Sequence, residues 1–419
     1  MDDQKAINCF PGYTFEDALE VKKRKNMYRG IDMSLGGYVY AEPGIYRNVA
    51  LIDAASLHPT SIILLNKLGE YTKRYADLRN ARVFIKHRDY ESASKLFDGK
   101  LKKYLTSDEE ADALSKALKL PLNGFYGISF ANFSNPARDV YDRNNIIALR
   151  GALFMKTLQD EVTAKGYKVV HIKTDSIKIA DATPEIISFV QEFGEKYGYE
   201  MEHEATYDRM CLVNDAVYIA KYDECGIRNK GGKHANEWTA TGAEFQHPYI
   251  FKTLFSKEPI EFKDMCETKS VSGNSSMYLD MNKEFVRDKE EELLRIKKEI
   301  LEFPKGQKGI MNLKKQIKIL DDEINSIHNY IYVGKCGSFV PVDDTVDGGI
   351  LVRSLINKTT GEKKMTSVVG TKGYRWLEAE EVKRLGIESH IDKLYFRNLI
   401  DDVHKDIEKY GEVDEFIYG

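Results

Sequence analysis

The pattern of apolar and polar positions predicts a β-hairpin near the middle of the chain. Two β-prone runs, 167–172 and 176–179, flank a short polar turn with Asp175 at its tip. A third run, 49–52, predicts a buried strand with Asp53 at its end. A Thr-Asp-Ser turn is also ordinary turn chemistry, so its meaning depends on its neighbours. A carboxylate at a strand end can hold a divalent metal ion where a phosphate can reach it.

Helical periodicity dominates the region between these strands. Residues 71–104 are helical and basic, and the spacing of Arg79, Arg82 and Lys86 places all three on one helix face. A capping box at Ser107 opens a second helix. We expect these two helices to form an antiparallel pair that projects from the domain.

The remaining elements are predicted by the same rules. A strand is expected at 210–218, and helices are expected at 145–165, 183–197, 283–302, 310–331 and 389–410. The apolar seam of 310–331 predicts packing against 283–302 in a helical hairpin. The glycine-rich segment 226–233 is expected to be a flexible basic loop.

Composition describes a globular protein with an uneven charge distribution. The 419 residues are 42% hydrophobic and 31% charged, and no apolar run approaches the length of a membrane span. The five cysteines are scattered without a C-x-x-C pair, which argues against zinc ribbons and disulfide frameworks. The net charge of −4 hides a basic region, 71–104, and an acidic tail, 377–419. This polarity is compatible with a nucleic-acid groove, and equally with a solvated helix face and a solubilising tail.

Three segments carry candidate chemistry. In chain order they are Asp53-Ala54-Ala55-Ser56-Leu57-His58-Pro59-Thr60-Ser61-Ile62, Lys119-Leu120-Pro121-Leu122-Asn123-Gly124-Phe125-Tyr126-Gly127 and Lys173-Thr174-Asp175-Ser176. They resemble motifs A, B and C of the family B DNA polymerases, which read roughly D-x-x-S-L-Y-P-S-I, K-x-x-x-N-S-x-Y-G and D-T-D-S. The resemblance covers about residues 35–260 and is closest to the bacteriophage enzymes, which the segment 369–376 also resembles.

This resemblance implies a right-hand polymerase of class α+β, with an antiparallel palm, two-helix fingers and a mostly helical thumb. The implied divisions are 1–70 for the N-terminal segment and first part of the palm, 71–130 for the fingers, 131–250 for the palm, and 251–419 for the thumb and C-terminal region. The implied reaction adds dNTPs to a primer 3′-OH on primer–template DNA. Two Mg²⁺ ions, which Mn²⁺ could replace, would be held by Asp53, Asp175 and the backbone carbonyl of Ala54.

The resemblance also assigns binding residues. The implied nucleotide-binding set is Ser56, Leu57, His58, Arg82, Lys86, Lys119, Asn123 and Tyr126. Lys119, Asn123 and Tyr126 recur at i, i+4 and i+7, so they share a helix face. Arg79 is a rival to Arg82 for the phosphates. The implied primer and DNA contacts are Thr174, Tyr218, Lys230 and Lys233.

Three departures from the family pattern bear on activity. Lys173 stands where the family has the first aspartate of motif C, which places a cation close to the metal site. His58 replaces a tyrosine that excludes ribonucleotides, and histidine is smaller and titratable. The family's K-x-Y element is reduced to Tyr218 in Ala216-Val217-Tyr218.

Other readings remain open at the level of sequence. Only 52 residues precede Asp53, too few for the family's proofreading exonuclease, so the exonuclease is either absent or a separate chain that docks on this one. The chain could instead be an impaired palm that serves as a DNA-binding or structural subunit of a replication complex. Motif B argues against a reverse transcriptase or primase. We expect a cytoplasmic, replicative enzyme with no membrane partner and with other replication proteins as partners.

Overall fold

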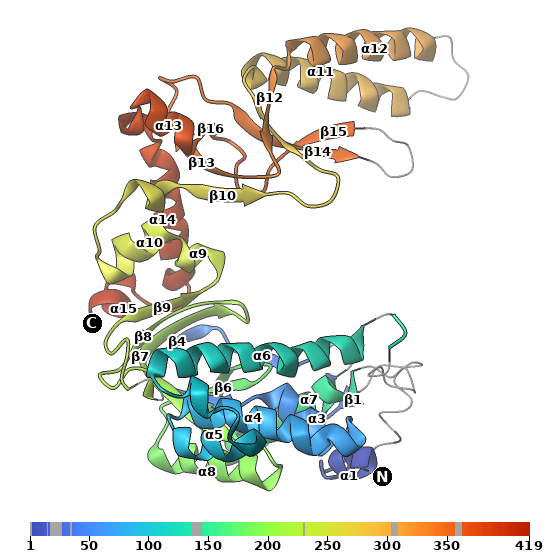
Figure 1. Ribbon diagram of the computed structural model, residues 1–419. Coiled ribbons are helices and arrows are strands. Elements are labelled where there is room, and N and C mark those ends of the chain that lie inside the picture. The colour runs from blue at the N-terminus through green and yellow to red at the C-terminus, as the bar shows by residue number, and fades with distance from the viewer. Residues whose placement is uncertain are drawn as a thin grey trace. The chain divides into compact units, whose positions relative to one another are not determined.

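The computed structural model describes residues 2–14, 16, 27–33, 36–131, 133–135, 145–228, 231–302, 309–356 and 363–419. The chain folds as two compact units that contain both helices and strands, confirming an α+β composition (Figure 1). The first unit comprises residues 1–246 and 404–419, and the second comprises residues 247–403.

A seven-stranded antiparallel sheet forms the centre of the first unit. Its strand order is β3-β5-β6-β4-β7-β8-β9. The strands are β3 (Val39–Ala41), β4 (Gly44–Ala54), β5 (Lys168–Lys173), β6 (Ser176–Ala180), β7 (Met201–Asn214), β8 (Val217–Tyr222) and β9 (Trp238–Thr241). Strands β5 and β6 form the predicted hairpin, and β6 pairs with β4 so that Asp53 lies opposite Ser176. The register therefore brings the end of β4 to the tip of the hairpin. The strand expected at 210–218 is the end of β7 and the start of β8, which a turn at 215–216 separates, because β7 ends at Asn214 and β8 begins at Val217.

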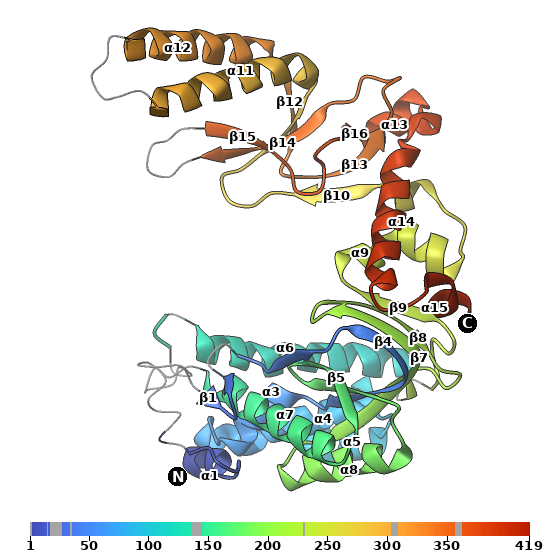
Figure 2. The ribbon, with the colours of Figure 1, turned by 180° about the vertical axis from the view of Figure 1, so that it is seen from behind.

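Helices cover one face of this sheet (Figures 1 and 2). They are α1 (Asp2–Asn8), α3 (Leu57–Leu64), α7 (Ile146–Ala164) and α8 (Pro184–Lys196). The core between the helices and the sheet is apolar, and Ile52, Leu153 and Phe154 are each 0% exposed. A Cβ at Gly151 would lie 2.8 Å from the Leu57 side chain, so a glycine in α7 allows α3 to approach closely.

The predicted antiparallel pair consists of α4 (Thr72–Lys86) and α6 (Asp108–Phe130). They pack through small and branched side chains that include Ala81, Ile85 and Ala111. The N-terminus of α6 is capped as predicted, because the Ser107 hydroxyl accepts from the Glu110 amide at 3.2 Å. The helical stretch 71–104 is not continuous: α4 ends at Lys86, and a short helix α5 (Tyr90–Lys95) follows.

The second unit contains more β-structure than the periodicity indicates. Two small sheets have the strand orders β10-β13-β16 and β12-β11-β14-β15. Their strands are β10 (Glu267–Ser270), β11 (Met277–Asp280), β12 (Tyr330–Gly334), β13 (Cys336–Val342), β14 (Ile350–Ile356), β15 (Lys363–Ser367) and β16 (Arg375–Glu378). The expectation of a thumb built mainly from helices is therefore incomplete.

Helices accompany these sheets in the second unit. They are α10 (Pro248–Ile250), α11 (Lys283–Glu302), α12 (Gly309–Ile327), α13 (Ala379–Leu385) and most of α14 (Lys393–Glu408). Helices α11 and α12 pair as predicted, but α12 ends at Ile327, and Ile331 lies in β12. The connection at 304–306 lies outside the described residues.

The chain end returns to the first unit. Arg209 donates from Nη1 to the Phe416 carbonyl at 3.1 Å and from Nη2 to the Gly419 carbonyl at 2.8 Å. The Phe416 ring also packs edge-on against Trp238 at 5.5 Å. Residues 404–419, with helix α15 (Val413–Tyr418), therefore belong with the first unit. In the described part of the chain, no helix has the length and apolar character needed to cross a membrane.

Candidate functional site

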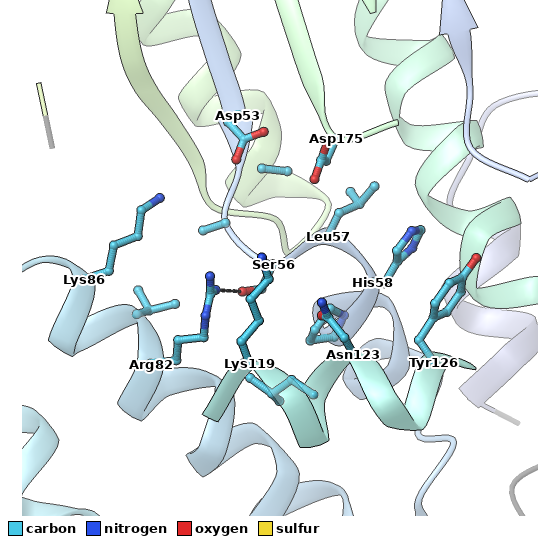
Figure 3. Close-up of a pocket in the computed structure, with 15 residues that line it drawn as sticks. Asp53, Ser56, Leu57, His58, Arg82, Lys86, Lys119, Asn123, Tyr126 and Asp175 are labelled. Carbon is cyan, nitrogen blue, oxygen red and sulfur yellow. Dashed lines mark hydrogen bonds between the residues drawn. The ribbon is translucent and has the colours of Figure 1, made fainter. Parts of the chain in front are cut away.

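A cavity of about 490 Å³ in the first unit collects most of the predicted site residues (Figure 3). Its walls come from the end of β4, the start of α3, helices α4 and α6, and the β5–β6 turn. Eleven of the predicted residues line it: Asp53, Ala54, Ser56, Leu57, His58, Arg82, Lys86, Lys119, Asn123, Tyr126 and Asp175. The structure thus brings together side chains separated by up to 122 positions in the sequence.

The two carboxylates lie at one end of this cavity (Figure 3). The Ala54 amide donates to the Asp175 carbonyl at 2.8 Å, which ties the end of β4 to the hairpin turn. The turn itself is held by the Thr174 amide, which donates to the Tyr38 carbonyl at 2.9 Å. Thr174 has a φ of 59°, a left-handed conformation that makes the turn tight. Backbone hydrogen bonds therefore fix where both carboxylates emerge.

The environment of these carboxylates opposes their negative charge. Burial, followed by the charge of Asp175 and then of Glu204, raises the pKa of Asp53 to about 7. Burial also raises the pKa of Asp175. Within the described residues, neither carboxylate forms an ion pair. Two adjacent acidic groups that form no ion pair among the described residues fit a divalent cation, which would neutralise their charge.

Basic side chains line another part of the cavity wall. Arg82 donates from Nη1 to the Ser56 hydroxyl at 2.9 Å, and Ser56 itself has a left-handed φ of 61°. Burial lowers the pKa of Arg82. Lys119 and Lys86 also reach the cavity, Lys119 from α6 and Lys86 from α4 (Figure 3). This charge distribution suits a polyphosphate close to metal-bound carboxylates.

Aromatic stacking shapes the wall between α3 and α6. The His58 and Tyr126 rings stack with centroids 4.2 Å apart and an angle of 3° between their planes. Asn145 donates to the Tyr126 hydroxyl at 2.6 Å, which fixes the tyrosine. Burial lowers the pKa of His58, and its Nδ1 is buried without a hydrogen-bond partner among the described residues. Asn123 lines the same wall, as expected from the i, i+4, i+7 spacing of Lys119, Asn123 and Tyr126.

Four predicted or rival residues lie away from this cavity. Arg79 pairs with Glu200 at 3.2 Å and does not line the cavity. Thr174 and Tyr218 are absent from its walls, and Lys233 is an exposed residue bridged to Ile227 in a turn. Lys230 lies outside the described residues.

Sequence reasoning missed a buried lysine next to the carboxylates. Lys178 on β6 is 3% exposed, and its Nζ lies 3.0 Å from Nδ1 of His171 and 5.0 Å from the centre of the Tyr218 ring. Burial lowers the pKa of Lys178. Strand periodicity gave a usable signal, because Lys178 is two positions from Ser176 and so lies on the same sheet face.

A second acidic group, on β7 and the residue before it, was also missed. Ligand atoms of His87, Glu200 and Glu202 lie within 4.8 Å of one another. Their charges are already matched, since Glu202 accepts from Lys86 at 2.5 Å and from His87 at 2.9 Å, and Glu200 pairs with Arg79. This cluster therefore forms an ion-pair network and is a poorer metal site than Asp53 and Asp175.

Comparisons with known proteins give little further information. No family model matches the sequence, and no curated protein matches it. Among solved structures, the family B DNA polymerase from the hyperthermophilic archaeon Pyrobaculum calidifontis resembles this chain with a TM-score of 0.41 and 12% sequence identity. The match covers 93% of this chain and 48% of that polymerase chain. This is a weak likeness, which by itself assigns no activity.

Proposed function

We propose that this protein is a template-directed DNA polymerase that adds dNTPs to a primer 3′-OH. The observation that carries the proposal is the arrangement of the cavity around Asp53 and Asp175. Two half-buried carboxylates, without ion-pair partners among the described residues, share it with basic side chains from two helices and with a stacked aromatic wall. A nucleoside triphosphate and two divalent ions are a chemically matched occupant for such a cavity.

Each part of the cavity has a role in this proposal. Asp53 and Asp175, with the carbonyl of Ala54, would hold Mg²⁺ or Mn²⁺. When bound, the ions would activate the primer hydroxyl and stabilise the leaving pyrophosphate. Lys119, Arg82 and Lys86 would bind the triphosphate through charge-assisted hydrogen bonds. The remaining wall would orient the sugar and the base; this wall is formed by Ser56, Leu57, His58, Asn123 and Tyr126.

The wider architecture belongs to the same proposal. The sheet with its helices would serve as the palm, α4 and α6 as the fingers, and the second unit as a thumb that contacts duplex DNA through its phosphates. Thr174, Tyr218, Lys230 and Lys233 would contact primer and template. A replicative, bacteriophage-type enzyme whose exonuclease is a separate docking chain is the finer form of the proposal.

Primer extension on a primed DNA template with Mg²⁺ tests the activity. The wild-type protein should add only the dNTP complementary to the template, and Asp175→Asn should abolish this addition. Glu185→Gln, which removes an exposed carboxylate from α8, is the matched control and should extend normally. Extension that is independent of the template, or that survives in Asp175→Asn, would contradict the proposal.

A second function has one observation in its favour. The buried Lys178 lies on the sheet face beside the carboxylates, where a positive charge would oppose metal binding. A palm impaired in this way could act as a DNA-binding or structural subunit of a replication complex. DNA binding that is equal in wild type and Asp175→Asn, without extension in either Mg²⁺ or Mn²⁺, would favour this alternative.

A further inference from the structure

A second cavity, of about 660 Å³, lies in the first unit and shares no lining residue with the candidate site. Helix α1 contributes Lys5 to its wall, α7 contributes Arg150, and the end of α8 contributes Lys196. Glu195 is the acidic residue in the lining. The wall therefore carries three basic groups against one acidic group, which favours an anionic occupant.

Arg150 is the unusual member of this lining. Its side chain is buried, with a residue exposure of 3%. Nε donates to the Ala6 carbonyl at 3.1 Å and Nη2 donates to the Tyr197 carbonyl at 2.9 Å. Nη1 is buried and has no hydrogen-bond partner among the described residues. The guanidinium thus retains donor capacity after it has satisfied two backbone carbonyls.

The charge of Arg150 also lacks a counter-ion within the described residues. Its nearest aromatic neighbours are the rings of Tyr199, at 4.8 Å, and Phe10, at 5.5 Å, which attract a cation without neutralising it. Buried charges in proteins are ordinarily paired or bound to a ligand, because an isolated buried charge is costly. An anion in the adjacent cavity would meet that requirement.

We propose that this cavity binds a phosphate-bearing small molecule, with Arg150 beneath it and the ammonium groups of Lys5 and Lys196 at the entrance. Both lysines are exposed, so they can close on an anion that the buried guanidinium has bound. Guanidinium and ammonium donors match phosphate oxygens in charge and geometry. The cavity has room for more than a single phosphate group. This site is independent of the polymerase proposal, because none of its residues lies in the other cavity.

The cavity contains its own reporter. Cys9 lines this cavity and is exposed. Cys225 and Cys336 are also exposed but lie elsewhere. Burial of part of the thiol raises the pKa of Cys9, so alkylation is best followed above neutral pH. Alkylation of the wild-type protein by iodoacetamide would be measured peptide by peptide, with inorganic phosphate, pyrophosphate or a dNTP present in turn. The ligand that fits should slow alkylation of Cys9 by about tenfold near saturation and leave Cys225 and Cys336 unchanged.

A second experiment reverses the charge of the two lysines at the cavity entrance. Lys5→Glu/Lys196→Glu should raise the ligand concentration that gives half-maximal protection of Cys9 by about tenfold or more. The control Lys372→Glu/Lys393→Glu, on exposed lysines of the second unit, should leave that concentration unchanged. The three ligands distinguish a free-phosphate site from a nucleotide site. Unchanged alkylation of Cys9 with all three ligands would overturn the proposal, and so would protection that persists unchanged in Lys5→Glu/Lys196→Glu.

Discussion

Two pairs of acidic side chains lie near each other in the first unit, and their surroundings differ sharply. Glu202 on β7 is the cross-strand neighbour of Asp53 on β4. Glu202 is held by Lys86 and His87, and Glu200 is held by Arg79. Asp53 and Asp175 have no such partner in the described part of the chain, although both are half-buried.

The pKa shifts of Glu202 and Asp53 record this difference. Burial acts to raise the pKa of Glu202, but the hydrogen bonds and charges of Lys86 and His87 hold it below its usual value. At Asp53, burial and the charge of Asp175 act together and raise the pKa. Glu202 is therefore a stable anion within a network, whereas the negative charges of the aspartates are unfavourable until a cation binds. We interpret the first pair as structural and the second as a ligand site.

The largest expected effect is the loss of catalysis on removal of an unpaired carboxylate. Asp175→Asn should reduce the rate of primer extension by about a thousandfold or more, because metal ions contribute several kcal/mol of transition-state stabilisation. Glu202→Gln should reduce the rate of primer extension by less than about tenfold, since this substitution only releases Lys86 from its ion pair. Single-turnover rates of both variants would check this contrast. Equal losses in the two variants would mean that the pairs do not differ in role.

A smaller effect with the opposite sign is expected on metal-free stability. The folded-state pKa of Asp53 is about 7, above the ordinary aspartate value of 3.8, so above pH 7 the folded protein carries an unfavourable charge. Asp53→Asn should therefore raise the free energy of unfolding at pH 8 by up to about 4 kcal/mol. The gain should shrink as the pH falls from 7 toward 4, because the wild-type folded state takes up a proton there. Denaturant unfolding in EDTA at several pH values measures this, and a gain independent of pH would count against the account.

The paired carboxylates should behave in the reverse way. Glu202→Gln should lower the free energy of unfolding by about 1–2 kcal/mol near neutral pH, because Lys86 and His87 lose a partner that is only 10% exposed. The folded pKa of Glu202 is lowered, so its contribution is present above the unfolded-state pKa and is lost as the pH falls through the folded value. Thermal unfolding of this variant beside Asp53→Asn would show shifts of opposite direction at pH 8.

The smallest effect is expected at Lys173, despite its place in the motif. Its side chain is exposed at the end of β5 and does not line the cavity, so solvent screens its charge. Lys173→Asp should change the apparent affinity for Mg²⁺ by no more than about threefold. A titration of extension rate against Mg²⁺ would check this, and a tenfold change would show that the lysine acts directly on the metal site.

Local patterns predicted the parts of the site that depend on short-range geometry. The β5–β6 hairpin and the shared face of Lys119, Asn123 and Tyr126 follow from strand and helix periods, and the structure confirms both. The same rule grouped Arg79 with Arg82, yet a helix period cannot say which residue meets Glu200 across the fold.

Long-range pairing explains most of what the sequence did not reveal. Ile331 continues the apolar spacing of α12, but it lies in strand β12, where it pairs with Leu279 of the neighbouring strand β11. The sheets of the second unit arise from such pairings between distant segments, which no local pattern encodes. The absence of ion pairs at Asp53 and Asp175 among the described residues is likewise a property of the folded arrangement. Lysines and arginines lie near both residues in the sequence, and only the structure shows that they do not pair with them.

Direct measurement of metal binding tests the central contrast most sharply. Calorimetric titration of Mn²⁺ into wild type, Asp175→Asn and Glu202→Gln compares the two acidic pairs under one condition. We predict that Asp175→Asn weakens binding by at least about tenfold and that Glu202→Gln changes it by less than about threefold. Binding that survives in Asp175→Asn and disappears in Glu202→Gln would place the metal at His87, Glu200 and Glu202 and contradict the account.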